Sequence, residues 1–85
     1  MRFERALVER LGGSRIEIRT KEQGHNIPHF HYVGPDVDAS FDLETCEIIA
    51  GNVNGREKRK IERFFFENGG KEKLKTFWDQ TRPGQ

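Results

Sequence analysis

The residues best suited to chemistry in this sequence are its three histidines, which all lie in the segment GHNIPHFHY, residues 24–32. His29 and His31 are two positions apart, and His25 precedes them by four. Neutral imidazoles bind zinc and other divalent transition metals, and a histidine can serve as a general acid or base near neutral pH. The spacing therefore predicts a metal site with His25, His29 and His31 as ligands. An enzyme would use His29, His31 and Asp38 as its catalytic groups.

Two strands are expected to position these histidines. Apolar and polar residues alternate over residues 29–33 and again over residues 37–43, as they do in half-buried strands. The apolar residues of both strands must face one core, so the histidines share the opposite, solvent-facing side with the polar residues of the second strand. These polar residues are Asp38, Ser40 and Asp42.

The turn between these strands leaves two registers open. A two-residue turn at Gly34-Pro35 places His31 opposite Asp38 and His29 opposite Ser40. A four-residue loop places His31 opposite Ser40, and His29 then lies opposite Asp42. In either register a histidine faces an aspartate, which favours the protonated imidazole and can orient it as a base or a ligand. The alternative to a functional site is a polar sheet face whose histidines bond to aspartates and loop carbonyls.

The remaining chain predicts a small α+β fold. Residues 15–19 alternate as a strand, and residues 47–50 form a short further strand. Residues 2–11 carry apolar residues at helical spacing before two glycines, which predicts a short helix, with a strand as the alternative. After residue 51 the apolar period becomes helical, and Asn54 with Glu57 forms a capping box that begins the first of two helices.

The expected architecture is therefore a three- to four-stranded antiparallel sheet with a C-terminal helix pair. The short N-terminal helix would pack with that pair on one face of the sheet. The chain length allows one domain, which we place at residues 1–80, followed by a short tail at residues 81–85.

Charge and composition narrow the class of protein. Six acidic residues and no Lys or Arg lie between Glu22 and Gly55, so a net charge of +1 conceals an acidic block between basic flanks. No apolar run approaches the roughly 20 residues of a membrane span, and the N-terminus MRFERALVERL does not read as a signal peptide. The single cysteine, Cys46, cannot form an internal disulfide. These features fit a cytoplasmic protein without membrane partners.

Two features of the first C-terminal helix suggest binding. Its start is basic, and nucleic acid could contact Arg56, Arg59 and Arg63, although a solvated helix face is the usual meaning of such a run. The run Phe64-Phe65-Phe66 is apolar, but only two of these rings fit one stripe. Phe66, or Phe64, therefore lies on the helix flank, where it covers an edge of the core or forms a patch that a partner buries.

Four segments, KEQGHNIPHFHY, DASFDLETCEIIAG, REKRKIERFFFENG and LKTFW, together resemble the bacterial family called domain of unknown function 4160. The resemblance runs from about Arg15 to Trp78, and Trp78 is the late aromatic of the pattern. Members resemble small cytosolic proteins that are often encoded beside another small gene, in toxin–antitoxin-like arrangements, which implies a protein partner. The histidine–proline segment of the family falls here on His25, Asn26, Pro28, His29, Phe30 and His31.

These observations together favour a partner-binding module over an enzyme. We expect a small cytosolic bacterial protein that is one component of a toxin–antitoxin-like or regulatory gene pair, or that self-associates. The first alternative is a metal-dependent hydrolase or nuclease that uses the histidine cluster. The second alternative is a regulator that binds nucleic acid through the basic helix at residues 56–63.

Overall fold

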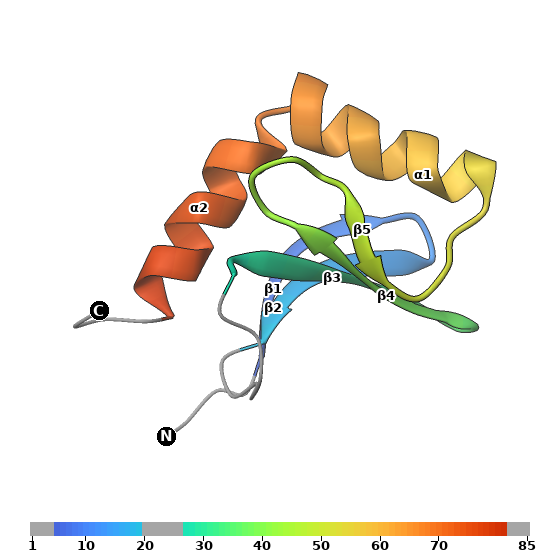
Figure 1. The fold of residues 1–85 in the computed structure, drawn as a ribbon, viewed down its shortest axis with the longest axis horizontal. Coiled ribbons are helices and arrows are strands. Elements are labelled where there is room, and N and C mark those ends of the chain that lie inside the picture. Colours follow the sequence, from blue (N-terminus) through green and yellow to red (C-terminus); the bar gives the residue numbers. More distant parts are fainter. Residues whose placement is uncertain (1–4, 20–26, 82–85) are drawn as a thin grey trace.

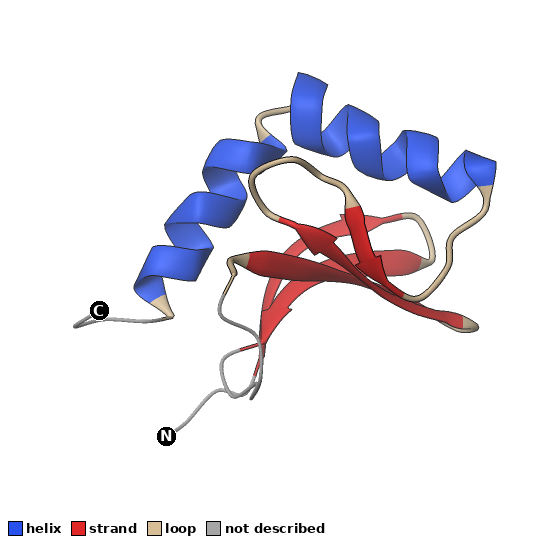
Figure 2. Cartoon of the chain, in the orientation of Figure 1, coloured by secondary structure: helices blue, strands red, loops and turns tan. Residues whose placement is uncertain are grey.

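The protein folds as an antiparallel sheet with two helices beside it, as Figures 1 and 2 show. The computed structural model describes residues 5–19 and 27–81. The strands lie in the order β1-β2-β3-β4-β5, so each strand pairs with its neighbour along the chain. The strands are β1 (Arg5–Leu11), β2 (Ser14–Arg19), β3 (His29–Gly34), β4 (Val37–Asp42) and β5 (Ile48–Ala50). The helices are α1 (Gly55–Glu62) and α2 (Gly70–Gln80), joined by the π-helical turn Arg63–Glu67.

The α+β class is confirmed, but the sheet has five strands instead of the predicted three or four, because the N-terminal segment forms the additional strand β1. The predicted helix over residues 2–11 is wrong, and its alternative is correct: β1 pairs antiparallel with β2. Gly12 has φ 64°, which glycine adopts easily, so the two glycines turn a hairpin and do not end a helix. A β-bulge between Leu7 and Glu9 interrupts the alternation of β1, and the resulting apolar spacing imitates that of a helix.

The other predicted elements are confirmed. The four predicted strand segments correspond to β2, β3, β4 and β5. The Asn54 side chain accepts a hydrogen bond from the Glu57 N–H at 2.8 Å, and Glu57 accepts one from the Asn54 N–H at 3.3 Å. This reciprocal capping box satisfies two backbone donors that the first turn of α1 would otherwise leave unpaired.

The core lies between the sheet and the helical segment. Phe30 stacks on Phe41 of the neighbouring strand at a ring-centroid distance of 5.4 Å and on Phe65 at 6.0 Å. Burial of one such ring stabilises the fold by about 2–3 kcal/mol. The fully buried side chains on this face also include Ile16, Ile18, Tyr32 and Leu74.

A π-helical turn decides which aromatic rings enter the core. The Asn68 N–H donates to the Arg63 carbonyl at 3.1 Å, a five-residue step that widens the helix. Phe64 and Phe65 are buried, whereas Phe66 is 64% exposed. The prediction that one ring of the run leaves the core stripe is confirmed, and the ring is Phe66.

Helix α2 packs tightly against the end of that turn. A Cβ atom on Gly70 would lie 2.5 Å from the Phe64 carbonyl oxygen, so only glycine permits this approach. The Lys73 ammonium pairs with the Glu9 carboxylate at 2.7 Å and ties α2 to β1. Among the described residues, no helix has the length and apolar character that crossing a membrane requires.

Candidate functional site

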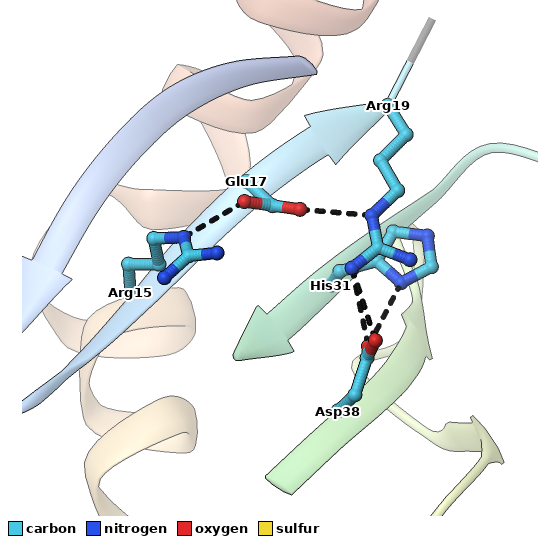
Figure 3. A network of polar contacts seen from close by, with 5 residues as sticks. All are labelled: Arg15, Glu17, Arg19, His31 and Asp38. Carbon is cyan, nitrogen blue, oxygen red and sulfur yellow. Dashed lines mark hydrogen bonds and ion pairs between the residues drawn. The ribbon is translucent and has the colours of Figure 1, made fainter. Parts of the chain in front are cut away.

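A charged network lies on the sheet face opposite the core (Figure 3). The Arg15 Nε donates to Glu17 Oε1 at 2.9 Å, and the Arg19 Nε donates to Glu17 Oε2 at 2.8 Å. The Arg19 Nη2 also reaches Asp38 Oδ2 at 3.1 Å, so its side chain bridges β2 and β4 across β3. His31 Nδ1 lies 3.7 Å from Asp38 Oδ1. Ion pairs and hydrogen bonds between charged side chains thus connect the three neighbouring strands β2, β3 and β4.

Glu17 is the buried centre of this network, with a side chain only 1% exposed. Burial raises the pKa of its carboxyl, but the hydrogen bonds and positive charges of Arg19 and Arg15 outweigh burial, and the pKa falls below its ordinary value. Burial lowers the pKa of Arg19, and the hydrogen bonds and charges of Glu17 and Asp38 more than compensate, so that pKa rises. Glu17 and Arg19 therefore both remain ionised at neutral pH.

Both described histidines are buried, so the prediction that they face solvent is wrong. His29 is 2% exposed and His31 is 6% exposed. The His29 ring packs edge-on against Trp78 of α2 at a centroid distance of 5.6 Å, and His31 lies beside the charged network. The predicted alternation of β3 is confirmed, but neighbouring side chains, among them Trp78 and Asp38, cover its polar face.

The hairpin has the register predicted with the four-residue loop, but the loop itself is shorter than predicted: Gly34 pairs with Val37, so the turn is Pro35-Asp36. His29 pairs with Asp42, and His31 pairs with Ser40. The Asp42 carboxylate, however, accepts the Glu44 N–H at 2.7 Å and so stabilises the turn after β4. The aspartate that approaches a histidine is the diagonal neighbour Asp38.

The described part of the predicted metal site holds two of its three residues. The His29 and His31 rings are 5.2 Å apart at an interplanar angle of 72°. His29 Nδ1 lies 2.9 Å from the Ile27 carbonyl oxygen, a contact that also orients many metal-bound histidines. His25 lies outside the described residues, and residues 5–19 and 27–81 contain no group of three or more metal-ligating side chains. Two imidazoles are fewer than the ligands a zinc site requires.

Pro28 and Phe30 of the histidine–proline segment have structural roles. Asn26 lies outside the described residues. The Pro28 carbonyl accepts the Leu43 N–H at 3.0 Å, and Phe30 is fully buried in the core. The segment therefore ties the start of β3 to the end of β4.

An apolar surface surrounds Phe66 at the opposite end of the sheet order from β1. Phe66 lines a hollow of about 690 Å³ together with Ile48, which is 47% exposed, and Val53. Glu47, Lys58 and Glu62 contribute charged groups to the same hollow. We call this hollow and its lining residues the Phe66 surface. It combines an exposed aromatic ring with a polar rim, the usual composition of a protein interface.

The Phe66 surface includes the only cysteine of the chain. Cys46 is 6% exposed, and burial, with a smaller effect from Glu62, raises the pKa of its thiol to about 12 despite the opposing charge of Lys58. The thiol is therefore protonated at neutral pH and a poor nucleophile.

The predicted nucleic-acid contacts of the basic helix are exposed. Arg56 and Arg59 lie on α1, and Arg63 begins the π-helical turn. Arg59 and Arg63 line a second hollow with Phe66 and the acidic Glu62 and Glu67. This end of the helix therefore has mixed charge instead of a continuous basic face.

Sequence reasoning missed Arg15, Glu17 and Arg19 as site residues. The signal was present in the strand RIEIR, where the charged residues alternate with Ile16 and Ile18. The parity that places His31 on the polar face of β3 also places it beside Glu17, its partner in the β2–β3 register.

Comparison with known proteins identifies a family for most of the chain. The sequence profile of Domain of unknown function (DUF4160) matches residues 13–79. The match covers β2 to α2, which includes the histidine–proline segment, the charged network and the Phe66 surface. No curated protein and no solved structure matches the chain significantly.

Proposed function

The chain belongs to the family Domain of unknown function (DUF4160), and from this premise we propose that it is a noncatalytic, cytoplasmic module that binds a protein partner through the Phe66 surface. The observation that carries the proposal is the 64% exposure of the Phe66 ring beside the half-exposed Ile48. Leaving an aromatic ring in water forgoes about 2–3 kcal/mol of burial, which a partner recovers when it covers the ring.

The surroundings of Phe66 fit a binding hot spot. Buried aromatic anchors dominate interface energies when charged groups around them exclude water. Here Lys58, Glu62 and Glu47 line the hollow next to the ring. The π-helical turn holds Phe66 outward while the preceding two rings anchor it to the core, so the ring is already positioned before a partner arrives.

Strand β5 adds a second element to the same surface. It is the last strand of the sheet order and is only three residues long. Its Ile48 and Ile49 are 47% and 37% exposed. Ile48 lines the hollow with Phe66, so a partner that covers the ring can also bury Ile48 and extend the apolar area of contact.

The partner that we propose is the product of a neighbouring gene, in a toxin–antitoxin-like or regulatory pair. The experiment is co-expression of the two proteins, followed by isothermal titration calorimetry of the separated components. The proposal predicts a complex of defined stoichiometry with a dissociation constant of about 1 μM or tighter. Two proteins that migrate separately and show no heat of binding would contradict it, and a concentration-dependent dimer of this chain alone would assign the surface to self-association.

The histidine cluster provides weaker support for a metal-dependent enzyme. His29 and His31 are both committed to packing and polar contacts within the described residues. The alternative remains a prediction that metal titration can test.

A further inference from the structure

Strands β1 and β2 place four arginines on one face of the sheet. Arg5 lies opposite Arg19, and Arg10 lies opposite Arg15. The bulge after Leu7 produces this arrangement, because the extra residue returns Arg10 to the face that Arg5 and Leu7 share. Like charges directly opposite each other destabilise a strand pair, and here two such pairs occur within one hairpin.

Acidic side chains neutralise only part of this charge. Glu17 accepts hydrogen bonds from Arg15 and Arg19, and Asp38 accepts a further pair from Arg19. In the stretches 5–19 and 27–81, Arg5 and Arg10 form no ion pair. The positive charges of Arg5 and Arg10 therefore remain unpaired by the Glu17 carboxylate, which already accepts hydrogen bonds from Arg15 and Arg19.

The uncompensated charge surrounds a hollow of about 360 Å³. Its lining consists of Arg5, Leu7, Arg10, Arg15 and Glu17. Leu7 is 45% exposed, so apolar surface lies between the guanidinium groups.

A further positive group lies at the tip of the same hairpin. A Cβ atom on Gly12 would be 3.4 Å from the Lys60 ammonium of α1. Lys60 therefore adds positive charge at the tip of the hairpin, which it reaches from the helix side of the sheet. Toward the other edge of the same face, β4 contributes Asp38 and Asp42, so the face is basic at β1–β2 and acidic at β4.

We propose that the face formed by Arg5, Arg10 and Arg15 binds the phosphate backbone of a single-stranded nucleic acid. A guanidinium group pairs with phosphate oxygens through two parallel hydrogen bonds. Arg5 and Arg10 are exposed, so a nucleic-acid strand can reach them. Arg5 and Arg10 lie opposite Arg19 and Arg15, which are four residues apart, so they are separated by about 13 Å along the strand. This separation suits two non-adjacent phosphates of one chain better than one isolated phosphate. Leu7 offers apolar contact to a sugar or base between them. This surface differs from the basic helix and is independent of the Phe66 surface.

The test is fluorescence anisotropy of a labelled single-stranded RNA of mixed sequence with the full chain at low salt. The variant is Arg5→Gln/Arg10→Gln, and the matched control is Arg56→Gln/Arg59→Gln on α1. Each double variant lowers the formal net charge from +1 to −1, so nonspecific electrostatics would affect both equally. Circular dichroism checks the fold, and Arg10→Gln alone replaces the strand variant if that variant unfolds.

The proposal predicts that Arg5→Gln/Arg10→Gln weakens binding at least about tenfold and lowers the slope of log affinity against log salt by about 1.4, the value for two lost phosphate contacts. The α1 control should weaken binding less than about threefold. Equal losses in both variants, a larger loss in the α1 control, or no binding by the wild type would overturn the proposal. Displacement of the RNA by inorganic phosphate at an equal concentration of phosphate groups would also overturn it, because the site would then fit a free anion.

Discussion

Arg19 of β2 reaches across β3 to Asp38 of β4, with its Nη2 3.1 Å from the Asp38 Oδ2. The same guanidinium donates to the buried Glu17 through its Nε. One side chain therefore connects strands that do not pair with each other, and His31 lies on the strand between them. The central strands are held in place by charge on this face and by aromatic packing on the other.

Replacement of Glu17 by Gln should destabilise the protein. The variant removes the charge between Arg15 and Arg19 and leaves one of their Nε donors facing an amide NH₂ group. The expected loss is about 2 kcal/mol in the free energy of unfolding, the range for hydrogen bonds to charged groups. Urea unfolding at about pH 7 measures it. The control Glu9→Gln removes an exposed pair with Lys73 and should cost less than about 1 kcal/mol.

The stabilities of the wild type and Glu17→Gln should respond differently to acid. The pKa of Glu17 in the folded state lies below its ordinary value of 4.5, so its contribution is complete above that pH and is lost as the pH falls through the lowered pKa. The stability difference between the wild type and Glu17→Gln should therefore shrink in acid. A difference of the same size at about pH 7 and about pH 3 would contradict this account of the network.

Cys46 should resist alkylation while the protein is folded. Its pKa rises from 9.0 to about 12, which lowers the reactive thiolate fraction about a thousandfold below pH 9. Iodoacetamide labelling followed by intact-mass spectrometry measures the rate at about pH 8. The denatured chain supplies the control, because its thiol is exposed. A native rate within tenfold of the denatured rate would show that the thiol is accessible and ionised.

The histidines should not hold a transition metal tightly. His29 contacts the Ile27 carbonyl and the Trp78 ring, and His31 lies against Asp38. These contacts give both histidines a structural role. We expect no binding of zinc, manganese or nickel tighter than about 10 μM by calorimetry. Near-stoichiometric metal in the untagged wild type, lost in a folded His29→Ala/His31→Ala variant, would contradict this expectation and favour the metal-dependent alternative, which nuclease and hydrolase assays would then test.

Local signals predicted much of this fold. Alternation identified the strands that became β2, β3 and β4, and the Asn54–Glu57 spacing located the start of α1. The recognition of the family rested on the histidine–proline segment, and the profile match at residues 13–79 confirms it. These features depend on residues close together in sequence, where the pattern itself carries the information.

The misses have two physical causes. The bulge in β1 broke the period of two, and a double glycine suits both a helix end and a hairpin, so the first strand resembled a helix. The burial of His29 depends on Trp78, about fifty positions later, which no local pattern reveals. The Glu17 network likewise requires the pairing of β2, β3 and β4.

The most direct test of the proposed function is the affinity of the neighbour-encoded partner for Phe66→Ser, compared with Leu7→Ser. Both changes remove an exposed apolar side chain: Phe66 is 64% exposed and Leu7 is 45% exposed. Leu7, however, lies on β1, at the sheet edge opposite to β5 and the Phe66 surface. We predict that Phe66→Ser weakens binding at least about thirtyfold, which corresponds to a hot-spot loss of about 2 kcal/mol, and that Leu7→Ser leaves it within about threefold. An unchanged affinity of Phe66→Ser for a partner that binds the wild type would contradict the central claim.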